Sequence, residues 1–267
     1  MGVRPFFPVL CLLLSSLGAC ASLENGPYWG QDAAASPGWS RIRHAAAKAA
    51  TDPLTWAPAL SAAALQIGDA DDEIADWANR HTPLFGSRET AADASDWLRG
   101  ASVALYLGTG LAAPVGDDAD WFDAKARGFA VGAGAIAATS ASTWLLKEVS
   151  DRPRPLGQND NSFPSGHTSL AAVSARLTHH TLGYYGLSRS ARTASDVGLA
   201  GLALMTGWAR IEAGEHHPAD ALAGAALGNF FAVFATEAFL APVAGDNAAL
   251  GVSPYGDGWT LHVFLAF

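Results

Sequence analysis

The chain has 267 residues, a length that fits one large domain or two small ones. Half of its residues are hydrophobic and 15% are charged, yet the mean hydropathy of +0.15 is low for a chain built mostly of bilayer-spanning helices. The formal net charge of -9 argues against a nucleic-acid partner, so any basic residues that bind phosphate must be gathered locally.

The first 23 residues have the features of a targeting segment. Arg4 is their only charged residue, and an apolar run from Val9 to Leu14 precedes a stretch of small residues. The sequence Leu17-Gly18-Ala19-Cys20 resembles a bacterial lipobox, in which the chain is cut before the cysteine that then carries the lipid. The sequence therefore predicts a lipoprotein-type signal peptide over residues 1–19 and lipidation of Cys20.

Cysteine usage fits this interpretation. Cys11 and Cys20 are the two cysteines of the chain, so the body of the protein has neither a disulfide nor a thiolate metal site. Ala21 follows Cys20, which resembles lipoproteins sent to the outer membrane. We expect a bacterial envelope protein that faces the periplasm and is held to the outer membrane by its lipid anchor. The alternatives are an ordinary secretory signal, cut after Ala19 or Ala21, and an uncleaved membrane anchor.

The rest of the chain predicts an all-α helical bundle with a short β-like or irregular tail. Residues 20–52 have the composition of a tether, residues 53–245 form the helical domain, and residues 246–267 form the tail. The tail alternates weakly around Gly256-Asp257-Gly258 and suits a small hairpin. Apolar periodicity and helix stop signals predict helices near residues 41–50, 53–67, 69–77, 90–111, 128–149, 165–180, 195–211 and 218–240.

Two of these predicted helices are long enough to cross a bilayer. They contain the apolar stretches 128–146 and 221–241. Glu237 interrupts the second stretch, and the many alanines and glycines of both also permit close packing inside a soluble core. The composition favours a soluble helical bundle, with a polytopic membrane domain as the alternative.

The first segment that carries chemistry follows the helix predicted at residues 128–149. Lys147 lies at the end of that helix, and Arg152-Pro153-Arg154-Pro155 comes soon after it. Proline stiffens the loop, so two guanidinium groups are presented at low entropic cost. Arginine matches phosphate oxygens bidentately, and lysine adds a point charge. A cation that merely complements a helix C-terminus would explain Lys147, but it does not explain the double Arg-Pro.

The second segment is a helix N-terminus. Phe163-Pro164 precedes Ser165, which can cap the apolar helix that follows. The free backbone N–H groups of such an N-terminus bind anions, and Gly166 lets an oxyanion approach closely. His167 then lies where it could protonate a leaving group. The alternative is a serine-capped helix with an exposed histidine.

The third segment combines arginine, histidine and aspartate. Pro218 suits the first position of a helix, which places His216 just outside it and Asp220 in its first turn. A carboxylate there can accept a hydrogen bond from the imidazole and fix its tautomer. Alternatively, Asp220 only complements the helix N-terminus, or His217 is the functional histidine. A metal site of His216, His217 and Asp220 lacks a third strong ligand, and no metal is predicted.

Together the three segments resemble the type 2 phosphatidic acid phosphatase family, which shares its fold with bacterial acid phosphatases and vanadium haloperoxidases. The family's first motif is a lysine, six residues, then Arg-Pro, which fits Lys147 and Arg154-Pro155 and selects Arg154 over Arg152. Its second motif, Pro-Ser-Gly-His, fits residues 164–167. The resemblance covers roughly residues 100–240.

The family's third motif is Ser-Arg, five residues, His, three residues, Asp. Arg210, His216 and Asp220 fit it, and the spacing selects His216 over His217. Ala209 stands where the family has serine, so any contact from that hydroxyl is lost.

The resemblance implies a division of roles. His216 is the nucleophile that forms a phosphohistidine, His167 protonates the leaving group, and Asp220 orients His216. Three cations replace the metal ions of other phosphatases, because phosphoryl transfer depends on positioning and charge neutralisation. The residues implied to bind phosphate are Lys147, Arg154, Ser165, Gly166 and Arg210.

The predicted function is metal-independent hydrolysis of phosphomonoesters, with lipid phosphates of the cell envelope as the expected substrates. No cofactor is expected, and vanadate should inhibit. The alternatives are a non-specific acid phosphatase of small soluble monoesters, a vanadium haloperoxidase with His216 as the metal ligand, and a non-enzymatic envelope lipoprotein.

Overall fold

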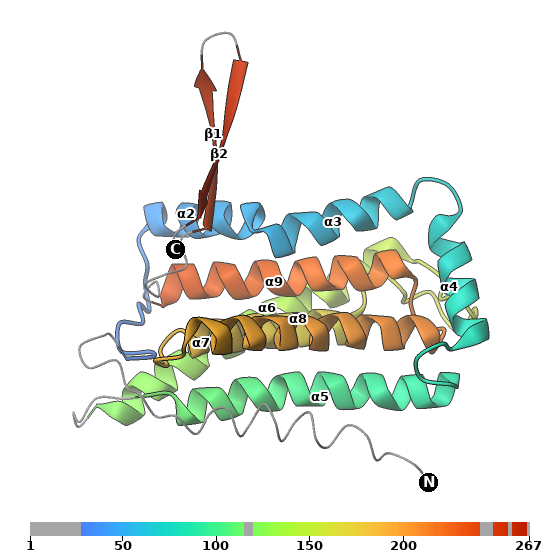
Figure 1. The fold of residues 1–267 in the computed structure, drawn as a ribbon, viewed down its shortest axis with the longest axis horizontal. Coiled ribbons are helices and arrows are strands. Elements are labelled where there is room, and N and C mark those ends of the chain that lie inside the picture. Colours follow the sequence, from blue (N-terminus) through green and yellow to red (C-terminus); the bar gives the residue numbers. More distant parts are fainter. Residues whose placement is uncertain (1–27, 115–119, 241–247, 256–257, 266–267) are drawn as a thin grey trace.

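A computed structural model describes residues 28–114, 120–240, 248–255 and 258–265. The predicted signal peptide and Cys20 lie outside these ranges. The described part confirms the all-α class, with an antiparallel hairpin in the tail (Figure 1). The elements are α2 (Trp39–Thr51), α3 (Pro53–Leu65), α4 (Ala70–His81), α5 (Arg88–Ala112), α6 (Trp121–Ser150), α7 (Gly166–Leu182), α8 (Arg189–Glu212), α9 (Pro218–Phe239), β1 (Ala248–Tyr255) and β2 (Gly258–Leu265).

Helix α7 is the centre of the bundle and packs against α5, α6, α8 and α9. Its buried side chains are mostly small, and the buried hydroxyls of Thr178 and Thr181 donate to carbonyls one turn earlier. Glycines let α9 approach closely. A Cβ at Gly224 would lie 2.5 Å from the carbonyl oxygen of Ser165, and one at Gly228 would lie 2.3 Å from that of Ser169. This contact fixes α9 against the N-terminal half of α7.

The predicted tether over residues 20–52 is wrong for its described part, which belongs to the bundle. The Trp29 side chain is 1% exposed and packs edge-on against Phe129 at a ring-centroid distance of 4.9 Å. Helix α2, where the sequence predicts a helix near residues 41–50, lies along α9 (Figure 1) and is tied to it by an ion pair of 2.6 Å between Lys48 and Glu237. Burial of the indole ring makes this segment part of the core.

One end of the bundle is closed by α4, which stands across the bundle (Figure 1). The loop from α4 to α5 is fastened to α8 by Glu212, whose side chain is buried. Its carboxylate accepts hydrogen bonds from the backbone N–H groups of Leu84 and Phe85, both at 3.0 Å, and from the indole of Trp208. These donors offset the cost of burying the charge.

Helices α6 and α9 are long and apolar enough to cross a membrane. The apolar window of α9 is 50% buried inside the bundle and that of α6 is 22% buried, so α6 presents more of its apolar surface outward. Core helices of soluble proteins pass the same test of length and composition. Large apolar side chains are also exposed on other helices, among them Trp97, Leu111, Val197 and Leu204.

The close approach of α9 to α7 predicts that the effect of a Gly→Ala substitution on stability depends on its position. Gly228→Ala should destabilise the protein by about 1–3 kcal/mol, because the new Cβ would meet backbone atoms of α7. Gly201→Ala is the matched control, since a Cβ on this face of α8 meets nothing within 4 Å and should stabilise the helix by about 0.5–1 kcal/mol. Thermal unfolding of both variants under one condition checks this, and equal melting temperatures would contradict the packing described.

Candidate active site

The three predicted segments meet at the end of the bundle that α4 closes (Figure 1). Each side chain comes from the terminus of a helix or from a connecting loop. The contributions are Lys147 from the last turn of α6, Arg154 from the α6–α7 loop, Ser165, Gly166 and His167 from the start of α7, Arg210 from the end of α8, and His216 and Asp220 from the start of α9.

The α6–α7 loop is closed by its own backbone. The N–H of Arg154 donates to the carbonyl of Asn159 at 2.9 Å, and the N–H of Ser162 donates to the carbonyl of Arg152 at 3.0 Å. The Lys147 ammonium donates to the carbonyl of Asn161, which ties the loop to α6. These bonds and the prolines fix where the two arginine side chains leave the loop.

The two arginines of this loop have different partners. Arg152 donates to Asp220 at 2.7 Å and to Asp71 of α4 at 2.6 Å, so two carboxylates occupy its guanidinium group. Arg154 instead forms an ion pair with Glu215, and its Nε is buried with no hydrogen-bond partner among the described residues. Of the two, Arg154 is therefore the one that retains a free donor for an anion.

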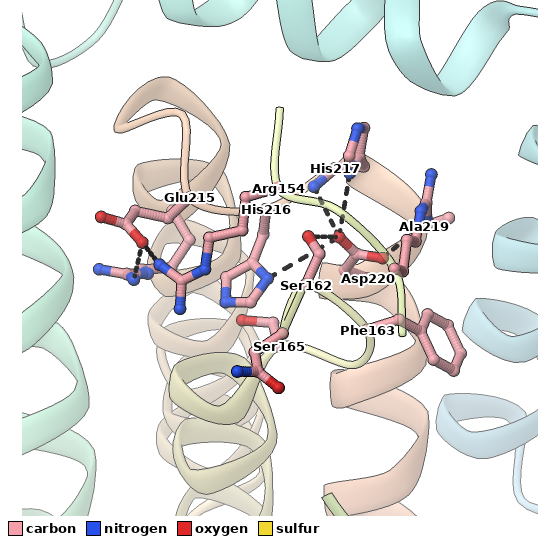
Figure 2. A network of polar contacts seen from close by, with 12 residues as sticks. Arg154, Ser162, Phe163, Ser165, Glu215, His216, His217, Ala219 and Asp220 are labelled. Atoms are coloured by element: carbon pink, nitrogen blue, oxygen red, sulfur yellow. Dashed lines mark hydrogen bonds and ion pairs between the residues drawn. The ribbon is translucent and has the colours of Figure 1, made fainter. Parts of the chain in front are cut away.

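Asp220 is fully buried and held by several donors. Its Oδ2 accepts from the hydroxyl of Ser162 at 2.6 Å and from the backbone N–H of His217 at 2.8 Å, while its Oδ1 accepts from Arg152. The Nδ1 atom of His216 lies 3.8 Å from the same Oδ2 (Figure 2). Asp220 is thus placed to orient the His216 imidazole.

Burial sets the protonation of this pair. Desolvation lowers the pKa of His216 to about 4, although Asp220 acts in the opposite direction. Burial would raise the pKa of Asp220, but the nearby His216 ring, hydrogen bonds from His217 and Ser162, and the charge of Arg152 hold that pKa far below its usual range. At neutral pH the site therefore contains a neutral imidazole beside a carboxylate.

His217 has different surroundings from His216. Its Nδ1 lies 3.3 Å from Oδ2 of Asp220 and its Nε2 lies 3.2 Å from Oδ1 of Asp72, so both ring nitrogens face carboxylates. His216 is 2% exposed, and its ring lies between Asp220 and Arg154 (Figure 2). The ring of His216, and not that of His217, therefore faces the cationic side of the site.

The start of α7 follows the predicted design of an anion site. Ser165 is the N-cap and its hydroxyl accepts from the hydroxyl of Thr168 at 3.0 Å. The backbone N–H of Ser165 donates to the carbonyl of Asp220 at 2.9 Å, which joins this turn to α9. Gly166 begins the helix, and the Ser165 hydroxyl also accepts from the N–H of Thr168, so the N–H groups of Gly166 and His167 are the ones left without a partner inside the helix.

His167 has a partner that the sequence analysis missed. Its Nε2 lies 2.9 Å from Oδ1 of Asp96, which comes from α5. Burial and the charge of Arg210 lower the pKa of His167, and the hydrogen bond with His167 holds the pKa of Asp96 below its ordinary value. No local pattern indicates a contact between residues so far apart in the sequence.

Arg210 is 8% exposed and has partners on both sides of its guanidinium group. Nη1 donates to the hydroxyl of Ser95 at 3.3 Å, and Nη2 pairs with Glu215 at 3.1 Å. Burial, and next the charge of Arg154, lower the pKa of Arg210 to about 10. Ser95 of α5 thus brings a hydroxyl to an arginine whose neighbour in the sequence is Ala209, where the family has serine.

The arrangement is that of an anion site with a nucleophile. Over the part of the chain that the structure describes, no group of three or more histidine, cysteine or acidic side chains is placed to hold a metal ion. Arg154 lies beside the His216 ring (Figure 2), and Lys147 and Arg210 are close enough for their charges to lower its pKa, a combination suited to a phosphoryl group.

Residues 128–242 match the family model described as the PAP2 superfamily, which confirms the resemblance inferred from the motifs. No curated protein matches the chain. Among solved structures, the chain is similar to a transmembrane PAP2 type phosphatidylglycerolphosphate phosphatase from Bacillus subtilis. The identity is 18%, the match covers 68% of this chain and 92% of that chain, and the TM-score is 0.49.

The depressed pKa of His216 predicts how stability depends on pH. Between the unfolded pKa of about 6.5 and the folded value of about 4, the unfolded chain binds a proton that the folded chain does not. Acidification across this window should therefore remove stability, by up to about 3 kcal/mol. His216→Asn should flatten the dependence, as measured by denaturant unfolding at several pH values. An unchanged slope in that variant would show that the buried imidazole is not responsible.

Proposed function

Because residues 128–242 match the PAP2 superfamily model, we propose that this chain is a metal-independent phosphomonoester hydrolase that works through a phosphohistidine at His216. The observation that carries the proposal is the buried, neutral His216 ring between the Asp220 carboxylate and the Arg154 guanidinium (Figure 2). A nucleophile requires this protonation state, and a phosphate requires these cations.

The phosphate is held by charges and by oriented backbone dipoles. Lys147, Arg154 and Arg210 neutralise its oxygens, which is the role that metal ions take in other phosphatases. The N–H groups at the start of α7, beside Ser165 and Gly166, add hydrogen bonds that cost little reorganisation because the helix already fixes them.

Two displacements complete the reaction. In the first, Nε2 of His216 bonds to phosphorus while the ester bond breaks, and His167 gives a proton to the leaving alcohol. In the second, water attacks the phosphohistidine, His167 takes a proton from that water, and inorganic phosphate leaves with His216 restored. Asp220 faces Nδ1 throughout and stabilises the positive charge that develops on the ring.

Replacing the nucleophile tests the chemistry. His216→Ala should lower turnover of a phosphomonoester by on the order of 10^4-fold or more, measured in buffer that contains EDTA. His81→Ala is the matched control, because His81 is an exposed histidine at the end of α4. Mass spectrometry of wild-type enzyme quenched in alkali should find the phosphoryl group on His216. Near-wild-type turnover by His216→Ala, or loss of wild-type activity in EDTA, would refute the mechanism.

The expected substrates are lipid phosphates. An apolar groove of about 420 Å³ runs between α3 and α9, and its wall includes Phe163 and Pro164, which directly precede the N-cap Ser165. Leu146 and Phe230 add apolar surface to the same groove. A lipid with its phosphate at His216 would have apolar surface for its chain close by.

The proposed location of the protein at the cell envelope also favours lipid phosphates as substrates. The lipobox-like segment that ends at Cys20 directs the protein to the cell envelope, with its lipid anchor in the outer membrane, and α6 and α9 supply apolar surfaces that can contact a bilayer. The substrate and the enzyme would then meet at the same membrane surface.

A change inside the groove separates lipid from soluble substrates. The wild-type enzyme should hydrolyse phosphatidic acid or phosphatidylglycerol phosphate in mixed micelles with a higher kcat/KM than p-nitrophenyl phosphate. Ala223→Phe narrows the groove and should lower kcat/KM for the lipid by about tenfold, with little effect on the small ester. Equal losses for both substrates would exclude the groove as a chain site. A preference of the wild-type enzyme for the small ester would favour the acid phosphatase alternative.

A further inference from the structure

Glu215 lies between the two arginines of the site and directly before His216 in the sequence. A single oxygen of its carboxylate, Oε2, pairs with Nη1 of Arg154 and lies 3.1 Å from Nη2 of Arg210. The side chain is 25% exposed, so the pair of contacts is partly shielded from water. Neither contact follows from the motifs, because the family pattern leaves this position open.

The backbone holds Glu215 firmly in this place. Helix α8 ends at Glu212, and Gly214 follows with a φ of 72°, a left-handed conformation that favours glycine. A Cβ at Gly214 would lie 2.5 Å from the side chain of Leu156. The N–H of Glu215 then donates to the carbonyl of Arg210 at 3.1 Å. The carboxylate is therefore directed by a turn of fixed geometry.

Glu215 contacts the arginines through edges that leave other donors free. On Arg154 the carboxylate contacts Nη1, which leaves the side edge formed by Nε and Nη2 available. On Arg210 the carboxylate contacts Nη2 and the Ser95 hydroxyl accepts from Nη1, so Nε is the donor that is left. The Nε atoms of both Arg154 and Arg210 are buried, and within the described ranges neither has a hydrogen-bond partner. Glu215 lies on the side of Arg154 that is remote from the His216 ring (Figure 2).

The charges are consistent with this geometry. Lys147, Arg154 and Arg210 bring three positive charges together, and Glu215 supplies one negative charge. Without a carboxylate between them, the two guanidinium groups would repel each other, and the charge of Arg154 already contributes to the lowered pKa of Arg210. The remaining charge of +2 matches a phosphomonoester dianion.

We propose that Glu215 is a positioning residue that clamps Arg154 and Arg210 together and leaves their Nε donors for the phosphate bound at His216. This inference rests on the proposed phosphatase function. The opposite role is a carboxylate that occupies the phosphate site and must be displaced. The two roles predict opposite effects of the same substitution.

Glu215→Gln tests the clamp, because it keeps the shape of the side chain and removes its charge. We expect kcat/KM for p-nitrophenyl phosphate to fall by about 10- to 100-fold and inhibition by vanadate to weaken, because misplaced arginines bind the transition state poorly. Glu73→Gln, an exposed glutamate of α4, is the matched control and should behave as wild type. Tighter vanadate inhibition and a lower KM in Glu215→Gln would overturn the clamp and establish the competing carboxylate.

A double-mutant cycle shows whether Glu215 acts through Arg154. Arg154→Lys removes the planar fork, so adding Glu215→Gln to it should change kcat/KM by less than about threefold. If the losses of kcat/KM caused by the two single substitutions multiply in the double variant, Glu215 does not act through Arg154. Melting temperatures equal to wild type exclude unfolding as the cause. Should Glu215→Gln unfold, Glu215→Asp replaces it, and unchanged kinetics in that shorter variant would also count against the clamp.

The proposed function and the clamp fail in different ways. If the His216→Ala variant, assayed in parallel, keeps high activity, the phosphohistidine mechanism itself is refuted. An inactive His216→Ala beside a fully active Glu215→Gln would leave the mechanism intact and remove the clamp alone.

Discussion

The buried carboxylate of Asp220 is the interaction on which the rest of the site depends. It joins the α6–α7 loop to the start of α9, because it accepts hydrogen bonds from Ser162 and Arg152 of that loop and from the backbone of His217. A buried carboxylate without such donors would be protonated or would destabilise the fold. The same donors that keep Asp220 charged therefore also fix the loop that presents Arg154 and the turn that presents His216.

The close packing of α7 on α9 places the anion site against that carboxylate. Gly224 allows the backbone of α9 to meet the carbonyl of Ser165, and the N–H of Ser165 bonds to the carbonyl of Asp220. A larger side chain at Gly224 would separate the two helix N-termini and move the free N–H groups of α7 away from His216. The glycines of α9 thus affect the site by setting the distance between α7 and α9. The site requires the N-termini of these two helices to lie side by side.

The sequence could predict what depends on local spacing. Helical periodicity located the bundle, and the separations between Lys147, Arg154, Arg210, His216 and Asp220 were enough to indicate the family whose model matches residues 128–242. Contacts made by isolated residues from other helices left no such signal, because an aspartate on α5 that faces His167 looks like any exposed helical carboxylate. Trp29 was missed for a related reason, since its surroundings of alanine, glycine and serine resemble a linker while its indole ring fills the core.

The residues that complete the site lie outside the segment that matches the family model. Arg152 is paired with Asp71, Arg210 with Ser95, and His167 with Asp96, and all three partners come from α4 or α5. Removing these helices would take one partner from each of Arg152 and Arg210 and the carboxylate partner from His167, and unpaired polar groups that stay desolvated cost more than the lost contacts alone. Residues 128–242 therefore carry the groups proposed to react, but the charge balance around those groups also requires the helices that precede them.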